Sequence, residues 1–121
     1  MKKLIICLLL IITSVHAYSQ DKNKKVSFAV KGNCAMCKAR IEKASLKVKG
    51  VKYVNWGIAS KQLILILDEN KCGPLDVKKA IARVGHDTDS AQADDNTYNN
   101  LPPCCKFRDP ESVHMDHNVK H

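Results

Sequence analysis

The stretch GNCAMC, residues 32–37, decides how the rest of this chain is interpreted. It places two cysteines three positions apart, Cys34 and Cys37, between an extended run at residues 25–31 and a helical pattern at residues 38–48. Two thiols with this spacing at the first turn of a helix converge on one small target. Soft thiolates select Cu(I), Zn(II) and, by extension, Hg(II) or Cd(II). Because a CxxC motif also serves redox proteins and many zinc sites, its position in the fold has to decide its role.

Hydrophobic periodicity on both sides of the motif predicts alternating strands and helices. Asn33 is the expected N-cap of the first helix, because its side chain can accept a hydrogen bond from a free backbone N–H. Gly85 is expected to end the second helix. The strands are predicted at residues 26–30, 51–58 and 63–67, the helices at 38–48 and 74–84, and a short fourth strand at 86–93.

The resulting order, βαββαβ, predicts an α+β fold of the ferredoxin-like kind. Such a sandwich has a four-stranded antiparallel sheet with both helices on one face. Strand direction then places the loops at 32–37, 59–61 and 85–87 at the same end, so that His86 lies near the two thiols. Cys72 is expected at the opposite end, roughly 15 Å away, because about a dozen helical residues rise 1.5 Å each.

The first 17 residues have the layout of a cleavable secretory signal. Lys2 and Lys3 precede an apolar run at residues 4–12, and small residues follow, with cleavage expected after Ala17. The apolar run is too short for a membrane span, so no span is expected after cleavage. We therefore expect a periplasmic or otherwise exported protein, in which an unoccupied dithiol meets oxidising conditions.

Charge is distributed unevenly along the chain. Residues 22–83 contain 15 Lys and Arg against 4 Asp and Glu, a balance of +11, whereas residues 84–121 contain 3 against 7, a balance of −4. This pattern indicates either a solvated lysine-rich surface or steering toward an acidic protein partner. Nucleic acid is not an expected partner, because the basic region has few aromatic residues and the protein is expected to be exported.

Several motifs in a fixed order resemble the heavy-metal-associated domain. They are the Gly-x-Cys-x-x-Cys turn, IEKA at 41–44, GV at 50–51, LD at 67–68, AI at 80–81 and GHD at 85–87. The resemblance covers residues 25–93. This domain forms small copper chaperones, N-terminal modules of copper-transporting P-type ATPases, and exported mercury-scavenging proteins. It implies a metal held by Cys34 and Cys37, no enzymatic activity, a monomer or metal-linked dimer, and a metal-transporting ATPase or envelope metal carrier as partner.

The sequence departs from that family at two positions near the thiols. The family usually has Met where this chain has Gly32, which predicts a looser loop or another side chain that fills the space. It commonly has Tyr, Phe or Lys where this chain has His86. His86 is therefore either a solvent-facing loop residue or a third metal ligand.

The tail, residues 94–121, is rich in Asn, Asp, Pro and His and is expected to be largely irregular. Cys104, Cys105, His114 and His117 offer a secondary metal site or a hand-off arm. In the alternative, Cys72 forms a disulfide with Cys104 or Cys105 that fastens the tail, which would stabilise the fold by roughly 3–4 kcal/mol.

These features together predict an exported metallochaperone that binds one soft ion through Cys34 and Cys37 and transfers or buffers it. Cu(I) is the first expectation, and Hg(II), Zn(II) and Cd(II) are the others. Three alternatives stay open. The protein could be a mercury or other heavy-metal scavenger on the same fold, a thiol–disulfide redox protein, or an interaction module that binds no metal.

Overall fold

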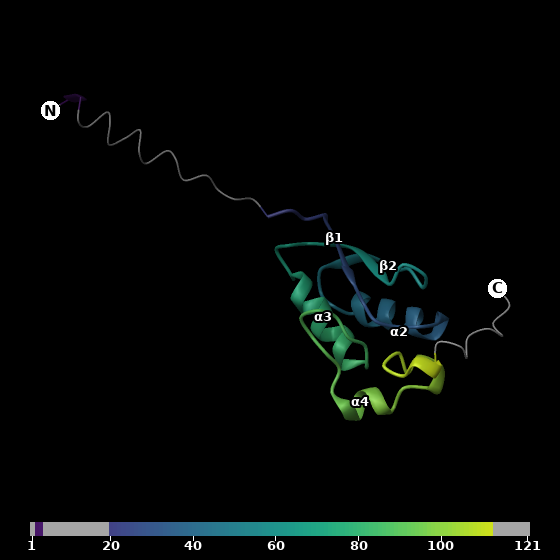
Figure 1. Ribbon diagram of the computed structural model, residues 1–121. Coiled ribbons are helices and arrows are strands. Elements are labelled where there is room, and N and C mark those ends of the chain that lie inside the picture. The colour runs from purple at the N-terminus through teal and green to yellow at the C-terminus, as the bar shows by residue number, and fades with distance from the viewer. Residues whose placement is uncertain (1, 4–19, 113–121) are drawn as a thin grey trace.

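A computed structural model describes residues 2–3 and 20–112 of the 121-residue chain. The described part forms an antiparallel sheet with two long helices, followed by two short helices (Figure 1). No helix in it has the length and apolar content needed to cross a membrane. The elements are β1 (Lys24–Ala29), α2 (Ala35–Leu46), β2 (Val51–Trp56), β3 (Gln62–Leu67), α3 (Pro74–Arg83), α4 (Asp95–Asn99) and the 3-10 helix η1 (Pro103–Cys105).

The sheet has β3 at its centre, between β1 and β2, and both pairings are antiparallel. On β3, Leu63, Leu65 and Leu67 are fully buried and alternate with half-buried isoleucines. The leucines share one core with Ile41 of α2 and Ile81 of α3. Both helices therefore cover the same face of the sheet, and the α+β class is confirmed.

The predicted fourth strand at residues 86–93 is wrong, because the sheet has three strands within the described residues. One backbone bond, from Lys31 N–H to Asp87 O (2.9 Å), links this segment to the chain that follows β1. The chain then turns, and Thr88 N–H donates to Ala91 O (2.8 Å). Asp and Ser are poor strand formers, and short polar side chains offer the backbone competing bonds. Here Ala93 N–H donates to the Asp87 carboxylate (2.8 Å) instead of joining a ladder.

Helix α2 begins at Ala35, ahead of the helical pattern at residues 38–48, and its N-cap residue is Cys34, one position after the expected Asn33. Asn33 is therefore not the N-cap, and its side-chain amide donates to Ser112 Oγ at 2.8 Å. Helix α3 ends where expected, before Gly85, whose φ of +107° lies in the left-handed region that favours glycine.

The tail was expected to be largely irregular; its described part contains only the short helices α4 and η1, and it is packed on the domain. Helices α4 and η1 lie beside the ends of α2 and α3 (Figure 1). The Arg108 guanidinium donates twice to the Asp87 carboxylate, at 3.0 and 2.9 Å. Leu101 lies against Gly85, where an added Cβ would come within 2.8 Å of the leucine side chain. The tail thus packs against the end of α3.

Trp56 occupies the space that Gly32 leaves open. The Trp56 side chain is fully buried, and its Nε1–H donates to Val30 O at 3.1 Å. A Cβ built at Gly32 would lie 3.0 Å from the Trp56 ring and 3.1 Å from Cys37 Cβ. Of the two expectations for this position, the second is confirmed: another side chain fills the space.

We predict that Gly32→Ala lowers the free energy of unfolding by about 1–2 kcal/mol, because the new methyl group overpacks the Trp56 ring. In a Trp56→Phe background the same change should cost about half as much, since the smaller ring leaves room. Urea denaturation followed by far-ultraviolet circular dichroism measures both costs. Gly73→Ala is the control, because its Cβ would meet only Asp76 Oδ2, at 3.9 Å. Equal costs in the two backgrounds would contradict the assignment of Trp56 as the filler.

Candidate metal site

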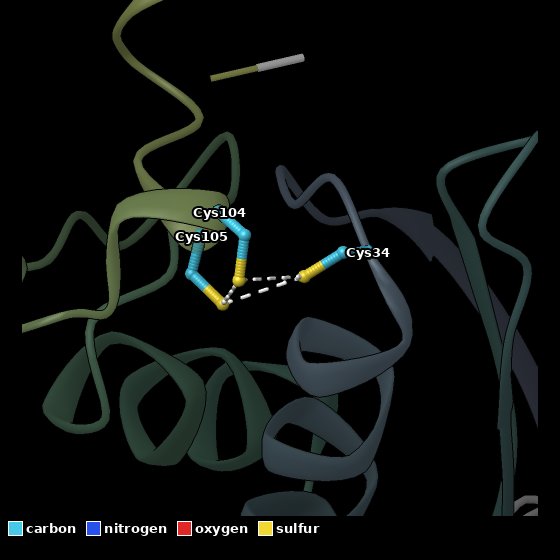
Figure 2. A group of neighbouring side chains, drawn as sticks. All are labelled: Cys34, Cys104 and Cys105. Atoms are coloured by element: carbon cyan, nitrogen blue, oxygen red, sulfur yellow. Dashed lines mark hydrogen bonds between the residues drawn. The ribbon is translucent and has the colours of Figure 1, made fainter. Parts of the chain in front are cut away.

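Four cysteine sulfurs from two distant segments gather at the start of α2. Cys34 Sγ lies 3.4 Å from Cys37 Sγ, 3.5 Å from Cys105 Sγ and 3.7 Å from Cys104 Sγ. The Cys104 and Cys105 sulfurs are 3.8 Å apart. Figure 2 shows Cys34, at the start of α2, facing the two tail cysteines of η1. We call these four residues the sulfur cluster. All four are free thiols in the structure.

Local structure fixes both halves of the cluster. As N-cap and third helical residue, Cys34 and Cys37 lie one turn apart, and Lys38 N–H donates to Cys34 O at 3.0 Å. On the tail side, Pro103 is the first residue of η1. The ring of proline fixes its backbone angle φ at a value that suits the first helical position. Cys105 N–H then donates to Pro102 O at 2.9 Å, which closes the turn that presents both thiols.

The pKa of the Cys34 thiol is shifted in the opposite direction to those of Cys37 and Cys104. Burial raises its pKa, but hydrogen bonds from the Cys37 backbone N–H and from the thiols of Cys37, Cys105 and Cys104 together outweigh burial, so the pKa is lowered. Burial raises the pKa of Cys37 and raises that of Cys104 to about 12. A thiolate is the form that binds metal. Cys34 is therefore the ligand from which metal binding would start.

Arg40 is the cation that contacts the sulfurs. Its Nη1 donates to Cys105 Sγ at 3.3 Å, so its charge offsets negative charge on that sulfur. The neighbouring cation Lys38 points elsewhere: its Nζ donates to Glu42 (2.7 Å) and to Trp56 O (2.8 Å). Glu42 also accepts from Trp56 N–H (2.9 Å), so this pair holds the tryptophan in place beneath the motif.

His86 lies near the cluster, as strand direction predicts, but it is fully buried, so the expectation of a solvent-facing residue is wrong. Its Nδ1 lies 2.9 Å from Lys31 O, and Nε2 lies 3.4 Å from Arg40 Nη1. The Phe107 ring of the tail stacks on the imidazole with centroids 5.4 Å apart. Both ring nitrogens are thus engaged. The role of third ligand stays a prediction.

Burial lowers the pKa of His86 to about 4, and the positive charge of Arg40 acts in the same direction. The hydrogen bond with Lys31 O opposes the shift without cancelling it. His86 is therefore neutral at pH 7, with the proton on Nδ1 for donation to the carbonyl, and Nε2 accepts from Arg40. The neutral imidazole accepts a hydrogen bond from the Arg40 guanidinium, which also donates to Cys105 Sγ.

Other predicted site residues lie elsewhere. Cys72 lies beside Gly50, near the far end of α2, and burial raises the pKa of its thiol. The alternative disulfide between Cys72 and Cys104 or Cys105 is wrong for this structure, because both tail cysteines contact Cys34. His114 and His117 lie outside the described residues. Cys104 and Cys105 were expected to form a separate site, and instead they join the CxxC motif.

The closing of the site by the tail is the feature that sequence reasoning missed. The contacts that dock the tail join residues distant in the sequence, from Asp87 with Arg108, 21 positions apart, to Asn33 with Ser112, 79 positions apart. No periodicity marks such pairs. The only available signal was compositional: two adjacent cysteines in an acidic segment that follows a basic domain with a CxxC motif.

Comparisons with known proteins point to one kind of domain. No protein-family model and no curated protein matches the chain. Among solved structures, oxidized MerP from Ralstonia metallidurans CH34 is 28% identical over 55% of this chain and 93% of its own, with a TM-score of 0.52. The CopZ metallochaperone is 26% identical over 54% of this chain and 98% of its own, also at 0.52.

A third match is the N-terminal domain of a potential copper-translocating P-type ATPase from Bacillus subtilis, in its Cu(I)-loaded state. It is 27% identical over 54% of this chain and 82% of its own, with a TM-score of 0.51. These are structural matches to heavy-metal-associated domains, so the resemblance found in the sequence is confirmed in the fold. Metallochaperones and metal-binding domains, rather than enzymes, make up these three matches.

We predict that the reduced, metal-free protein loses stability as the pH falls below about 6.5. The pKa of His86 is about 4 in the folded state against 6.5 for the free side chain, so the unfolded state binds the proton more tightly. The contribution is complete above pH 6.5 and decreases by roughly 3 kcal/mol as the pH falls to 4. Denaturant titrations from pH 7.5 to 4 measure it. His86→Gln should remove most of this slope; an unchanged slope would contradict the buried neutral imidazole.

Proposed function

We propose that the protein is an exported carrier that binds one soft metal ion, Cu(I) first, through Cys34 and Cys37. The observation that carries the proposal is the pair of thiols 3.4 Å apart at the first turn of α2. The pair lies on a fold shared with the CopZ metallochaperone and with a Cu(I)-loaded ATPase domain. Thiolates are soft donors and therefore favour a soft ion such as Cu(I).

The chemistry is binding and transfer, without catalysis. Each cysteine that binds the ion loses its proton to solvent, and Cys34, whose pKa is lowered by hydrogen bonds to its sulfur, is the first ligand. A partner's thiolate then displaces one of the two ligands, and the ion moves by successive exchange without passing through the free state. The metal keeps its oxidation state, so no electron donor is required.

The proposed partner is a metal-transporting ATPase or an envelope metal carrier, reached as a monomer or through a metal-linked dimer. One matched structure is a domain of such an ATPase. The surface beside the motif fits an acidic partner, because exposed Met36 lies next to a hollow lined by Arg40 and Lys43. Complementary charge would speed the encounter of the two proteins. An exported location follows from the signal-like residues 1–17.

A second candidate on the same fold is a scavenger of Hg(II) or of another thiophilic ion such as Cd(II) or Zn(II). The similarity to MerP, at 28% identity, favours this reading, and the extra tail thiols raise the capacity for such ions. A thiol–disulfide redox protein is the remaining alternative. It would use Cys34, whose pKa is lowered, as the attacking thiolate.

We predict that the reduced protein binds one Cu(I) tightly and that Cys34→Ser/Cys37→Ser abolishes this binding. Native mass spectrometry after reconstitution, with a competing Cu(I) chelator present, counts the retained ion. Cys72→Ser removes a thiol at the other end of α2 and should retain one ion. If the double variant holds copper as tightly as the wild type, Cys34 and Cys37 are not the site. A preference for Hg(II) over Cu(I) in competition would favour the scavenger, and catalytic disulfide reduction the redox protein.

A further inference from the structure

The tail sulfurs are part of the metal site itself. Among the described residues, Cys34, Cys104 and Cys105 form the group whose ligand atoms all lie within 4.8 Å of one another. We propose that Cys34, Cys104 and Cys105 form a three-thiolate site that holds the ion at rest, while Cys37 serves its entry and exit. This inference rests on the proposed function, because it specifies how the same ion is held and what regulates its release.

The sulfur distances favour three ligands over two. Metal–thiolate bonds of about 2.3 Å place the sulfurs about 4.6 Å apart in a linear two-ligand site and about 4.0 Å apart in a planar three-ligand site. Cys34 and Cys37, at 3.4 Å, would have to separate by about 1.2 Å for the linear geometry. The three sulfurs of Cys34, Cys104 and Cys105 are 3.5–3.8 Å apart. They need to spread by only about 0.2–0.5 Å.

Hydrogen bonds of residues that follow Cys104 and Cys105 in the sequence anchor the tail. This anchoring preorganises the site. Arg108 donates to Asp87 at 2.9 and 3.0 Å and to Ala93 O at 2.8 Å. The Asn33 amide, next to the first ligand, donates to Ser112 Oγ at 2.8 Å. Because Asp87 is buried, removal of Arg108 would leave its carboxylate without its cation. The docked position of the tail is thus fixed by groups that bind no metal.

The surroundings can support the charge of three thiolates. With a monovalent ion, three thiolates carry a net charge of −2. Arg40 donates directly to Cys105 Sγ at 3.3 Å and offsets part of it. Neighbouring His86 adds no charge at neutral pH, and its ring holds Arg40 from the other side at 3.4 Å. Arg40 is therefore a positioning residue that favours the tail ligand.

The sequence of events conserves protons and electrons. An ion arriving on Cys34 and Cys37 displaces one proton from each thiol. Cys104 and Cys105, which already lie beside Cys34, then each release a proton and bind the ion, and Cys37 dissociates from it and takes up a proton. Release runs in the opposite direction. A partner must therefore wait for the tail to leave or displace it, so the tail slows transfer and favours retention.

X-ray absorption fine structure of the Cu(I)-loaded, reduced full chain tests the ligand set. We expect three sulfur neighbours per copper in the wild type, in Cys72→Ser and in Cys37→Ser, and two in Cys104→Ser/Cys105→Ser. Two neighbours in the wild type, or three in the tail double variant, would overturn the inference. A count that falls to two in Cys37→Ser would show that Cys37 belongs to the resting site. Failure of the proposed function is a different result: no stoichiometric copper in the wild type.

Transfer kinetics test the same inference with every thiol intact. We predict that Arg108→Gln, which releases the tail, speeds copper transfer to a small dithiol acceptor about tenfold or more. The fold should survive, because Arg108 lies outside the main core; circular dichroism checks this. Arg83→Gln, at the end of α3, is the matched control and should transfer at the wild-type rate. Equal rates for the wild type and Arg108→Gln would overturn the proposed role of the tail in retention.

Discussion

The paired hydrogen bonds between Arg108 and Asp87 hold together the part of this fold that differs from a plain two-layer domain. Asp87 is only 4% exposed, so its charge requires a partner, and Arg108 supplies it in a two-pronged contact. Asp87 also accepts from Ala93 N–H, so one carboxylate both turns the chain after α3 and receives the tail. The segment in which a fourth strand was expected is thus held by the same carboxylate that holds the tail.

Beneath the CxxC motif, the side chain of one residue fills a space that another residue leaves open. Gly32 leaves a space next to Cys37, and the ring of Trp56, the last residue of β2, fills that space. Glu42 fixes the Trp56 backbone from the side of α2. The loop that carries Cys34 is therefore supported by a rigid aromatic ring. A rigid base suits a site whose ligands come from two segments, because one half must stay in place when the other moves.

The sequence permits prediction of the central part of the fold and of the first two ligands. The strands and helices from β1 to α3 follow from apolar periodicity, which depends on neighbours within a few positions. The tail does not, since its position depends on contacts of Arg108, Phe107 and Ser112 with residues that are distant in the sequence. His86 shows the boundary between the two cases. Strand direction predicts the end of the sheet at which His86 lies. The burial of His86 depends on Phe107, and no local sequence pattern predicts that contact.

Cys34 and Cys37 are only 1% and 0% exposed while the tail is docked, so exchange of a ligand with a partner requires the tail to move. In this chain the competitor is built in, because two further thiols stand 3.5 and 3.7 Å from Cys34 before any ion arrives. Ligands on the same chain compete at an effective concentration that an outside protein rarely matches. Under the proposed function, the docking of the tail would then set the balance between retention and delivery of the ion. The release of the ion would then depend on Arg108, Asp87 and Asn33, which hold the tail in place and do not bind the ion.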